Sequence, residues 1–97
     1  MEHLHDRCPH VNKEEIKKSV FPSAEVLQMP EQIAGRRKKL EKGMILGNNH
    51  KHKVKIVFEE KEGIKKVETT IWAAMEKNIS LKGGVFIPIH RIHDVVI

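Results

Sequence analysis

The sequence predicts a mainly β fold with N-terminal helices, in which a five-stranded antiparallel small barrel is capped by one or two short helices. Three observations lead to this class. A chain of 97 residues has room for one domain. The hydrophobic period changes from helical to two at Lys53. The turns that follow are too short for crossover helices, so neighbouring strands must be antiparallel, and such a sheet closes economically as a small barrel.

The expected domain organisation has one folded unit behind a short arm. Residues 1–11 lack hydrophobic periodicity and are expected to form a flexible N-terminal arm. The single domain spans 12–97 and comprises a helical segment at 12–46, a hinge at 47–52 and the small barrel at 53–97. The hinge is expected because its Gly-Asn-Asn run tolerates positive φ and offers local hydrogen bonds.

The first helix is indicated by a capping pattern. Asn12 followed three residues later by Glu15 resembles a capping box, so a short helix is expected to begin there and to run to about Val20. Pro22 ends it. The second and longest helix is expected to begin at Pro30, because proline suits the first helical position.

This second helix is expected to run to about Lys42 and to stop at Gly43, where a glycine follows the last periodic residue. Basic residues gather toward its C-terminal end, which suits the helix dipole. Its apolar face is narrow and consists of Ile33, Ala34, Leu40 and Met44.

The barrel strands are read from alternation and from turn residues between them. A charged turn at 60–63 and a glycine turn at 82–84 separate strands rich in β-branched residues. The strand that contains Pro88 is expected to lie at an edge there, because proline cannot donate to a ladder. The expected strands are 53–59, 67–75, 79–81, 85–89 and 94–97.

The net charge of +5 is concentrated in one stretch of the chain. Residues 36–55 hold eight basic groups against Glu41 alone, whereas 56–97 is balanced. Clustered Lys and Arg are the electrostatic footprint of nucleic-acid binding. A solvated helix face with dipole-complementary charge explains the same run, and both readings stay open. Aromatic residues for base stacking are few, since tyrosine is missing and there are three Phe and one Trp.

The order of these elements resembles the Sm-like fold: an N-terminal helix, a first strand, a long bent second strand, a short third, and a fourth joined to the last by one tight turn. Hydrophobic residues of the last two strands match the spacing of the second Sm motif, namely Val85, Phe86, Ile87, Ile92, Val95 and Ile97. The run Asn78-Ile79-Ser80-Leu81 resembles the end of the first motif, where an asparagine lies in the nucleotide-binding loop. His90 falls near the RNA-binding histidine of bacterial Sm-like RNA chaperones.

The resemblance covers less than half of the chain, and the turn after the fourth strand lacks the family's Arg-Gly pair. The alternation also fits an SH3-like barrel, and a fold does not carry its function with it. The chain is similar as well to short uncharacterised bacterial proteins with an Ile-Pro-hydrophobic strand near the end. Sm-like and SH3-like barrels therefore remain two alternatives for the fold family.

The leading functional hypothesis is a non-enzymatic protein that self-associates and binds nucleic acid, with RNA as the expected partner. Two residues of the expected interface come from the Sm resemblance and the rest from the basic stretch: Arg36, Arg37, Lys38, Lys39, Lys42, Lys51, Lys53, Lys55, Asn78 and His90. The alternative is an SH3-like protein-interaction module whose apolar outer face receives a partner's segment.

Strand alternation also predicts an apolar outer face. If the residues around Trp72 at odd positions point inward, then Val57, Trp72, Phe86 and Val96 point outward. Such a patch is seldom left exposed on a monomer. Either the N-terminal helices or another subunit is expected to cover it, and the second option makes a homo-oligomer.

Other classes find little support in the sequence. Four potential zinc ligands lie within eight residues, namely His3, His5, Cys8 and His10. Such a short contiguous segment is more typical of a frayed terminus, so no metal site is expected. No catalytic motif is recognisable, so no enzyme activity, cofactor or small-molecule substrate is expected. No apolar run has the length of a membrane span, and a single cysteine agrees with a cytoplasmic location.

Overall fold

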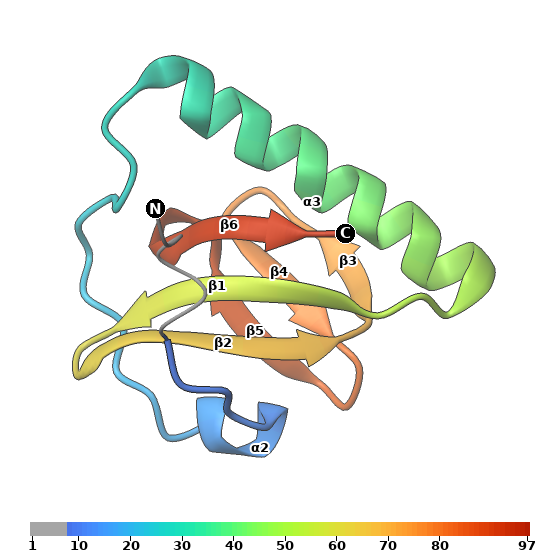
Figure 1. Cartoon of the computed structure of the whole chain (residues 1–97), viewed down its shortest axis with the longest axis horizontal. Helices are drawn as coiled ribbons and strands as arrows, with labels where there is room; N and C mark the ends of the chain where they lie inside the picture. Colours follow the sequence, from blue (N-terminus) through green and yellow to red (C-terminus); the bar gives the residue numbers. More distant parts are fainter. Residues whose placement is uncertain (1–7) are drawn as a thin grey trace.

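The structure is a computed structural model that describes residues 8–97 (Figure 1). It is mainly β with one long helix, which confirms the expected class. Its elements in chain order are α2 (Lys13–Ile16), α3 (Pro30–His50), β1 (Val54–Glu60), β2 (Gly63–Thr69), β3 (Ile71–Ala74), β4 (Asn78–Leu81), β5 (Val85–Pro88), the 3-10 turn η1 (Ile89–Arg91) and β6 (Ile92–Val96).

The strands form two antiparallel sheets of three strands each. Sheet A has the order β2-β1-β6 and sheet B the order β3-β4-β5. The expected long second strand is divided at Thr70, so that its first part pairs in sheet A and its second part in sheet B. The two sheets are not closed into a barrel.

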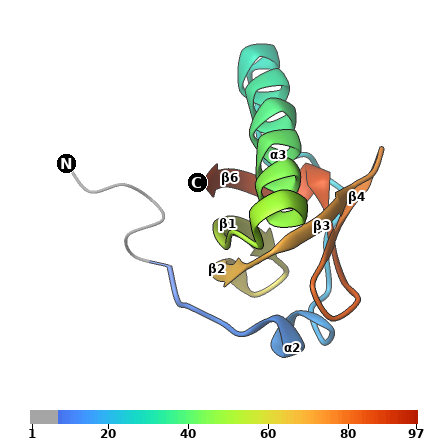
Figure 2. The same cartoon turned by 90° about the vertical axis from the view of Figure 1, so that its right-hand side faces the viewer.

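Two helices cover the open sides between the sheets. α3 contacts β3 of sheet B and β6 of sheet A, while α2 contacts β5 of sheet B and β2 of sheet A. Figure 2 shows α3 and α2 on opposite sides of the strands. Each helix therefore joins an edge strand of one sheet to an edge strand of the other.

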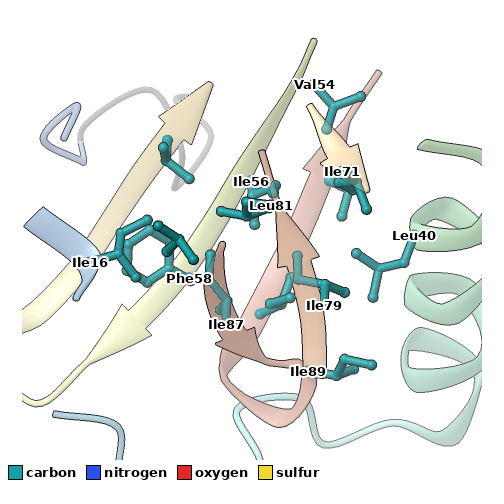
Figure 3. Packing of buried hydrophobic residues seen from close by; sticks show 14 residues of the cluster. Ile16, Leu40, Val54, Ile56, Phe58, Ile71, Ile79, Leu81, Ile87 and Ile89 are labelled. Carbon is teal, nitrogen blue, oxygen red and sulfur yellow. The ribbon is translucent and has the colours of Figure 1, made fainter. Parts of the chain in front are cut away.

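The core lies between the sheets and is completed by one residue from each helix (Figure 3). Ile16 of α2 reaches in beside Phe58 from one side. Leu40 of α3 reaches in toward Ile71 and Ile79 from the other. Burying a side chain of this size contributes about 1.5–3 kcal/mol relative to exposure, so these contacts help to hold both helices against the sheets.

α3 does not end at Gly43 as expected but continues to His50. Gly43 and Gly47 are buried one turn apart, and a Cβ on Gly43 would lie 3.2 Å from Cδ1 of Ile71. The glycines permit a close helix–sheet approach, which outweighs their low helix propensity of about 1 kcal/mol each. The helix ends where Lys51 adopts the left-handed conformation at φ 54°, so the first residues of the expected hinge are helical.

The described part of the expected arm lies along the outer edge of β2. Lys66 donates its N–H to the carbonyl of Pro9, and Val11 donates to the carbonyl of Lys66, each at 2.9 Å. Asn12 then caps α2 by accepting from the N–H of Glu15 at 3.2 Å, as the capping pattern predicts. These backbone bonds cover part of an edge that would otherwise present unpaired groups.

Candidate nucleic-acid interface

Arg36, the first residue of the basic stretch, is not on the surface. It is 5% exposed, and its two terminal nitrogens donate to both carboxylate oxygens of Glu25. Nη1 also donates to the carbonyl of Ile92 at 3.0 Å. The guanidinium holds the pKa of the Glu25 carboxyl below its ordinary value. Arg36 therefore attaches α3 to the segment that precedes it, and the Glu25 carboxylate neutralises its charge.

Two residues of η1 fasten the same connecting segment between α2 and α3. Nε2 of His90 lies 3.0 Å from the carbonyl of Pro22, and since a carbonyl only accepts, this nitrogen carries the proton. Arg91 is buried and donates to the carbonyls of Ala24 and Glu59 at 2.7 and 3.0 Å. These contacts explain how a segment without regular structure is held in place.

The remaining basic residues divide into partnered and unpartnered groups. Arg37 donates to the carbonyl of Glu76 at 2.9 Å, and Lys39 forms a 2.8 Å ion pair with Asp94 of β6. Five exposed lysines of the stretch form no ion pair within residues 8–97: Lys38, Lys42, Lys51, Lys53 and Lys55.

These five lysines follow one path. Helical spacing places Lys38 and Lys42 on the face of α3 opposite Leu40, which faces the core. Lys51 and Lys53 lie in the connection from α3 to β1, and Lys55 lies on β1 itself. We call this path along the outside of α3 and around its C-terminal end the lysine track.

A groove of about 600 Å³ lies where the first half of α3 meets the ends of sheet B. Arg37 lines one wall, and Lys77 and Asn78 from the β3–β4 connection line another. The rest of the lining comes from Glu25, Ile33, Arg36, Glu76, Pro88, Ile89 and His90. The structure thus brings together three residues that the sequence singled out separately, Arg37, Asn78 and His90.

Sheet B carries two exposed aromatic residues on its outer face. Trp72 on β3 is 49% exposed and Phe86 on β5 is 54% exposed. Ser80 of the central strand pairs directly with Phe86 and shares its face. Of the other aromatics, Phe58 is buried and Phe21 packs against it at a centroid distance of 6.1 Å.

The expected four-residue patch is not continuous, because only Trp72 and Phe86 share a sheet. Val96 is exposed at the end of β6, opposite Lys55 in sheet A. Val57 is 1% exposed and was wrongly expected on the surface. It lies on the central strand of sheet A, where side chains of β2 and β6 flank it on both sides. Neither helix buries Trp72 or Phe86.

A separate ion pair stabilises the β1–β2 hairpin beside α2. The carboxylate of Glu60 is buried and lies 2.8 Å from Nζ of Lys65. Hydrogen bonds from Lys65 and then from Ser19 lower the pKa of the Glu60 carboxyl, and the carboxylate raises the pKa of Lys65. The charges are matched within the hairpin, so this cluster is structural.

The terminal histidine and cysteine residues show no metal centre within the described chain. His3 and His5 lie outside the described residues. Cys8 is half-buried and His10 is exposed beside β2. Within residues 8–97, no group of three or more His, Cys, Asp or Glu side chains is placed to hold a metal ion.

Two lysines of the site were not singled out from the sequence. Lys77 precedes β4 and Lys82 follows it, and both are exposed. The sequence feature that marks these two lysines is their position at either end of the uncharged run Asn78–Leu81. Glu25 was missed because nothing local in the sequence marks a partner eleven residues from Arg36.

No protein-family model, curated protein or solved structure matches the chain. Within residues 8–97, no helix combines the length and the apolar composition needed to cross a bilayer.

Proposed function

We propose that this protein is a non-enzymatic nucleic-acid-binding domain whose partner is RNA. The observation that carries the proposal is the lysine track, which presents five exposed ammonium groups without carboxylate partners among the described residues. A protein that neutralises phosphates with such groups releases condensed counterions, which supplies much of the binding free energy.

The pairing of nearby carboxylates supports this reading. Glu25 is taken up by Arg36, and Asp94 lies 2.8 Å from Lys39. Two carboxylates close to the basic stretch are thus matched by other cations, while Glu41 on α3 and Glu68 opposite Lys55 leave the track with a surplus of positive charge, five lysines against two carboxylates. A solvated helix face with balanced charge would instead show the track lysines paired along the helix at i,i+3 and i,i+4 positions.

The groove supplies groups that contact more than phosphate. Asn78 offers both a donor and an acceptor, which suits the edge of an unpaired base. Arg36, Arg37 and Lys77 outnumber the two carboxylates of the lining, Glu25 and Glu76, and Glu25 is already paired with Arg36. Lysine track and groove lie on different sides of α3, so one strand passing around the helix could touch both.

We extend the proposal to the fold family. If β2 and β3 are counted as one strand bent at Thr70, the strands follow the order β6-β1-β2/β3-β4-β5, with η1 as the tight turn before the last strand. This arrangement supports an Sm-like small barrel and, with it, self-association. Light scattering tests the second part: a ring of several chains supports it, and a monomer at tens of micromolar contradicts it.

Nucleic-acid binding is tested by fluorescence anisotropy of a labelled single-stranded RNA at 50 and 200 mM salt. We expect the association constant to fall steeply with salt, with a log–log slope of about −0.7 for each phosphate neutralised. Replacing Lys38, Lys42, Lys51 and Lys53 by Gln should remove most of that slope.

The matched control replaces Lys18 and Lys61, which are exposed beside α2 and away from the track. It should leave both affinity and slope nearly unchanged. The control removes two charges and the track variant four, so a loss of slope half as large in the control would show a nonspecific effect of net charge. No salt-sensitive binding at micromolar protein would contradict the proposed function.

A further inference from the structure

We infer that the outer face of sheet B is a platform for single-stranded nucleic acid, on which Trp72 and Phe86 each stack against a base. The inference rests on the proposed nucleic-acid function and goes beyond it, because it names the strandedness of the ligand and the residues that contact its bases. The surface is distinct from the lysine track.

The placement of the two rings fits this role. Trp72 and Phe86 lie on the outer strands β3 and β5. On β4 between them, Ser80 pairs with Phe86 on one side and with Ala73 on the other, and Trp72 lies next to Ala73 at the register shift of β3. Two strand spacings separate the aromatic positions by roughly 10 Å. Half of each side chain is open to solvent, so both ring systems have accessible surface above a small, polar central residue.

The charge distribution indicates what covers this face. None of the residues of β3, β4 and β5 is ionisable, so no negative charge on these strands repels a phosphate group. Lys77 and Lys82 lie exposed at the two ends of β4, and the groove with Arg37 opens beside Asn78 and Pro88. The face is therefore uncharged at its centre and has cations at both ends, Lys82 at one and Lys77 and Arg37, beside Glu76, at the other.

Sheet A offers a useful contrast. Its outer face carries charges of both signs, since Lys55 lies opposite Glu68 in the strand register, and Lys66 and Asp94 lie on either side of Val57. It carries no exposed aromatic residue in the described chain. The combination of exposed rings and flanking cations is thus a property of sheet B alone.

A second copy of the chain is a poorer occupant of the platform. An aromatic side chain buries about 150–250 Å², so the half-exposed rings of two copies would contribute roughly 400 Å² together. A stable interface needs about 1,000 Å² or more, so a contact between copies would have to take most of its area from residues other than the two rings. Base stacking requires only the ring faces, and it is sequence-tolerant because every base has a π-face. A duplex keeps its bases stacked on one another, so it could not use the platform.

Trp72 is the only tryptophan, so its emission reports the platform directly. We expect titration with an unlabelled oligouridylate to quench this emission, and a duplex of equal length to leave it unchanged. Trp72→Leu and Phe86→Leu should each weaken single-strand binding, measured by anisotropy of a labelled oligonucleotide, by about 5- to 100-fold. Val20→Ala, at a 60% exposed apolar residue away from the platform, should not. Unfolding midpoints of the variants should match the parent.

The outcomes separate this inference from the proposed function. If salt-sensitive binding occurs with unchanged emission and Trp72→Leu binds like the parent, stacking is refuted while nucleic-acid binding stands. If no oligonucleotide binds at all, both fail. If the emission shifts to the blue as protein concentration rises without oligonucleotide, the face is a contact between copies and the platform is refuted.

Discussion

A β-carbon at Gly47 would lie 2.6 Å from the carbonyl oxygen of Ile71, closer than real contacts allow. The same atom would lie 2.9 Å from Cγ2 of Thr70. The last turns of α3 thus rest directly on the backbone where β2 passes into β3. Because a backbone oxygen cannot swing aside as a flexible side chain can, the glycine sets the distance between helix and sheet.

Gly47→Ala should therefore destabilise the protein although alanine is the better helix former. The gain in propensity is about 1 kcal/mol, whereas overpacking against backbone costs about 1–3 kcal/mol or more. Urea unfolding should show a lower midpoint. Gly35→Ala is the matched control, since nothing lies within 4 Å of its Cβ position, and it should stabilise by up to about 1 kcal/mol. A stabilising Gly47→Ala would contradict the close approach.

Ile16 should carry most of the stabilisation that α2 provides. The helix has four residues, and Ile16 is its only buried residue. Ile16→Ala should lower the free energy of unfolding by about 2–4 kcal/mol, because it removes core volume beside Phe58. Val20→Ala, in the same segment but 60% exposed, should change it by less than about 0.5 kcal/mol. Similar decreases in the free energy of unfolding for both variants would show that lost core packing is not the cause of the destabilisation.

Acid should weaken the fold through Glu25. Its pKa is depressed in the folded state, chiefly by hydrogen bonds from Arg36, so the unfolded chain binds the proton more readily. The stabilisation is therefore complete above the ordinary Glu pKa of about 4.3 and is lost as pH falls through the depressed value. Unfolding free energies measured from pH 6 to pH 3 should fall. Glu25→Gln should be less stable at pH 6 and should show a shallower fall, and an unchanged slope would exclude Glu25 as a contributor.

Lys65 should contribute an alkaline limit to stability. Its pKa is raised by the Glu60 carboxylate, so its contribution is complete below the ordinary Lys pKa of about 10.4 and is lost as pH rises through the raised value. Lys65→Gln should remove this alkaline loss and should leave a buried carboxylate without its cation, costing about 1–3 kcal/mol at neutral pH. Lys61→Gln, exposed in the same hairpin, is the control and should change neither.

Some local signals in the sequence predict the structure correctly. The Asn12 cap depends on residues three apart, and the hydrogen bond from Glu15 is present. Alternation in β1 places Val54, Ile56 and Phe58 in the core, and alternation past Ile71 leaves Trp72 exposed. Each of these features follows from neighbours along the chain, which is what a period of two or a capping pattern records.

Features set by tertiary neighbours could not be read in this way. The continuation of α3 past Gly43 depends on the sheet beneath it, and the burial of Val57 depends on its strand being central. Arg36 belongs to the same charge run as Lys38, yet only the first meets a carboxylate. A run of like charges thus predicted a charged surface without showing which members were already bound within the fold.

The bridge that α3 makes between β3 and β6 bears on how the protein emerges from the ribosome. Ile92–Val96 are made about 40 residues after α3 is complete, which at typical rates is on the order of 2–8 s. During that interval β1 lacks β6, one of its two neighbouring strands, and Lys39 lacks its ion-pair partner Asp94. The half-built sheet and the inner side of the helix are then exposed together, so the nascent chain is most open to association before β6 joins sheet A.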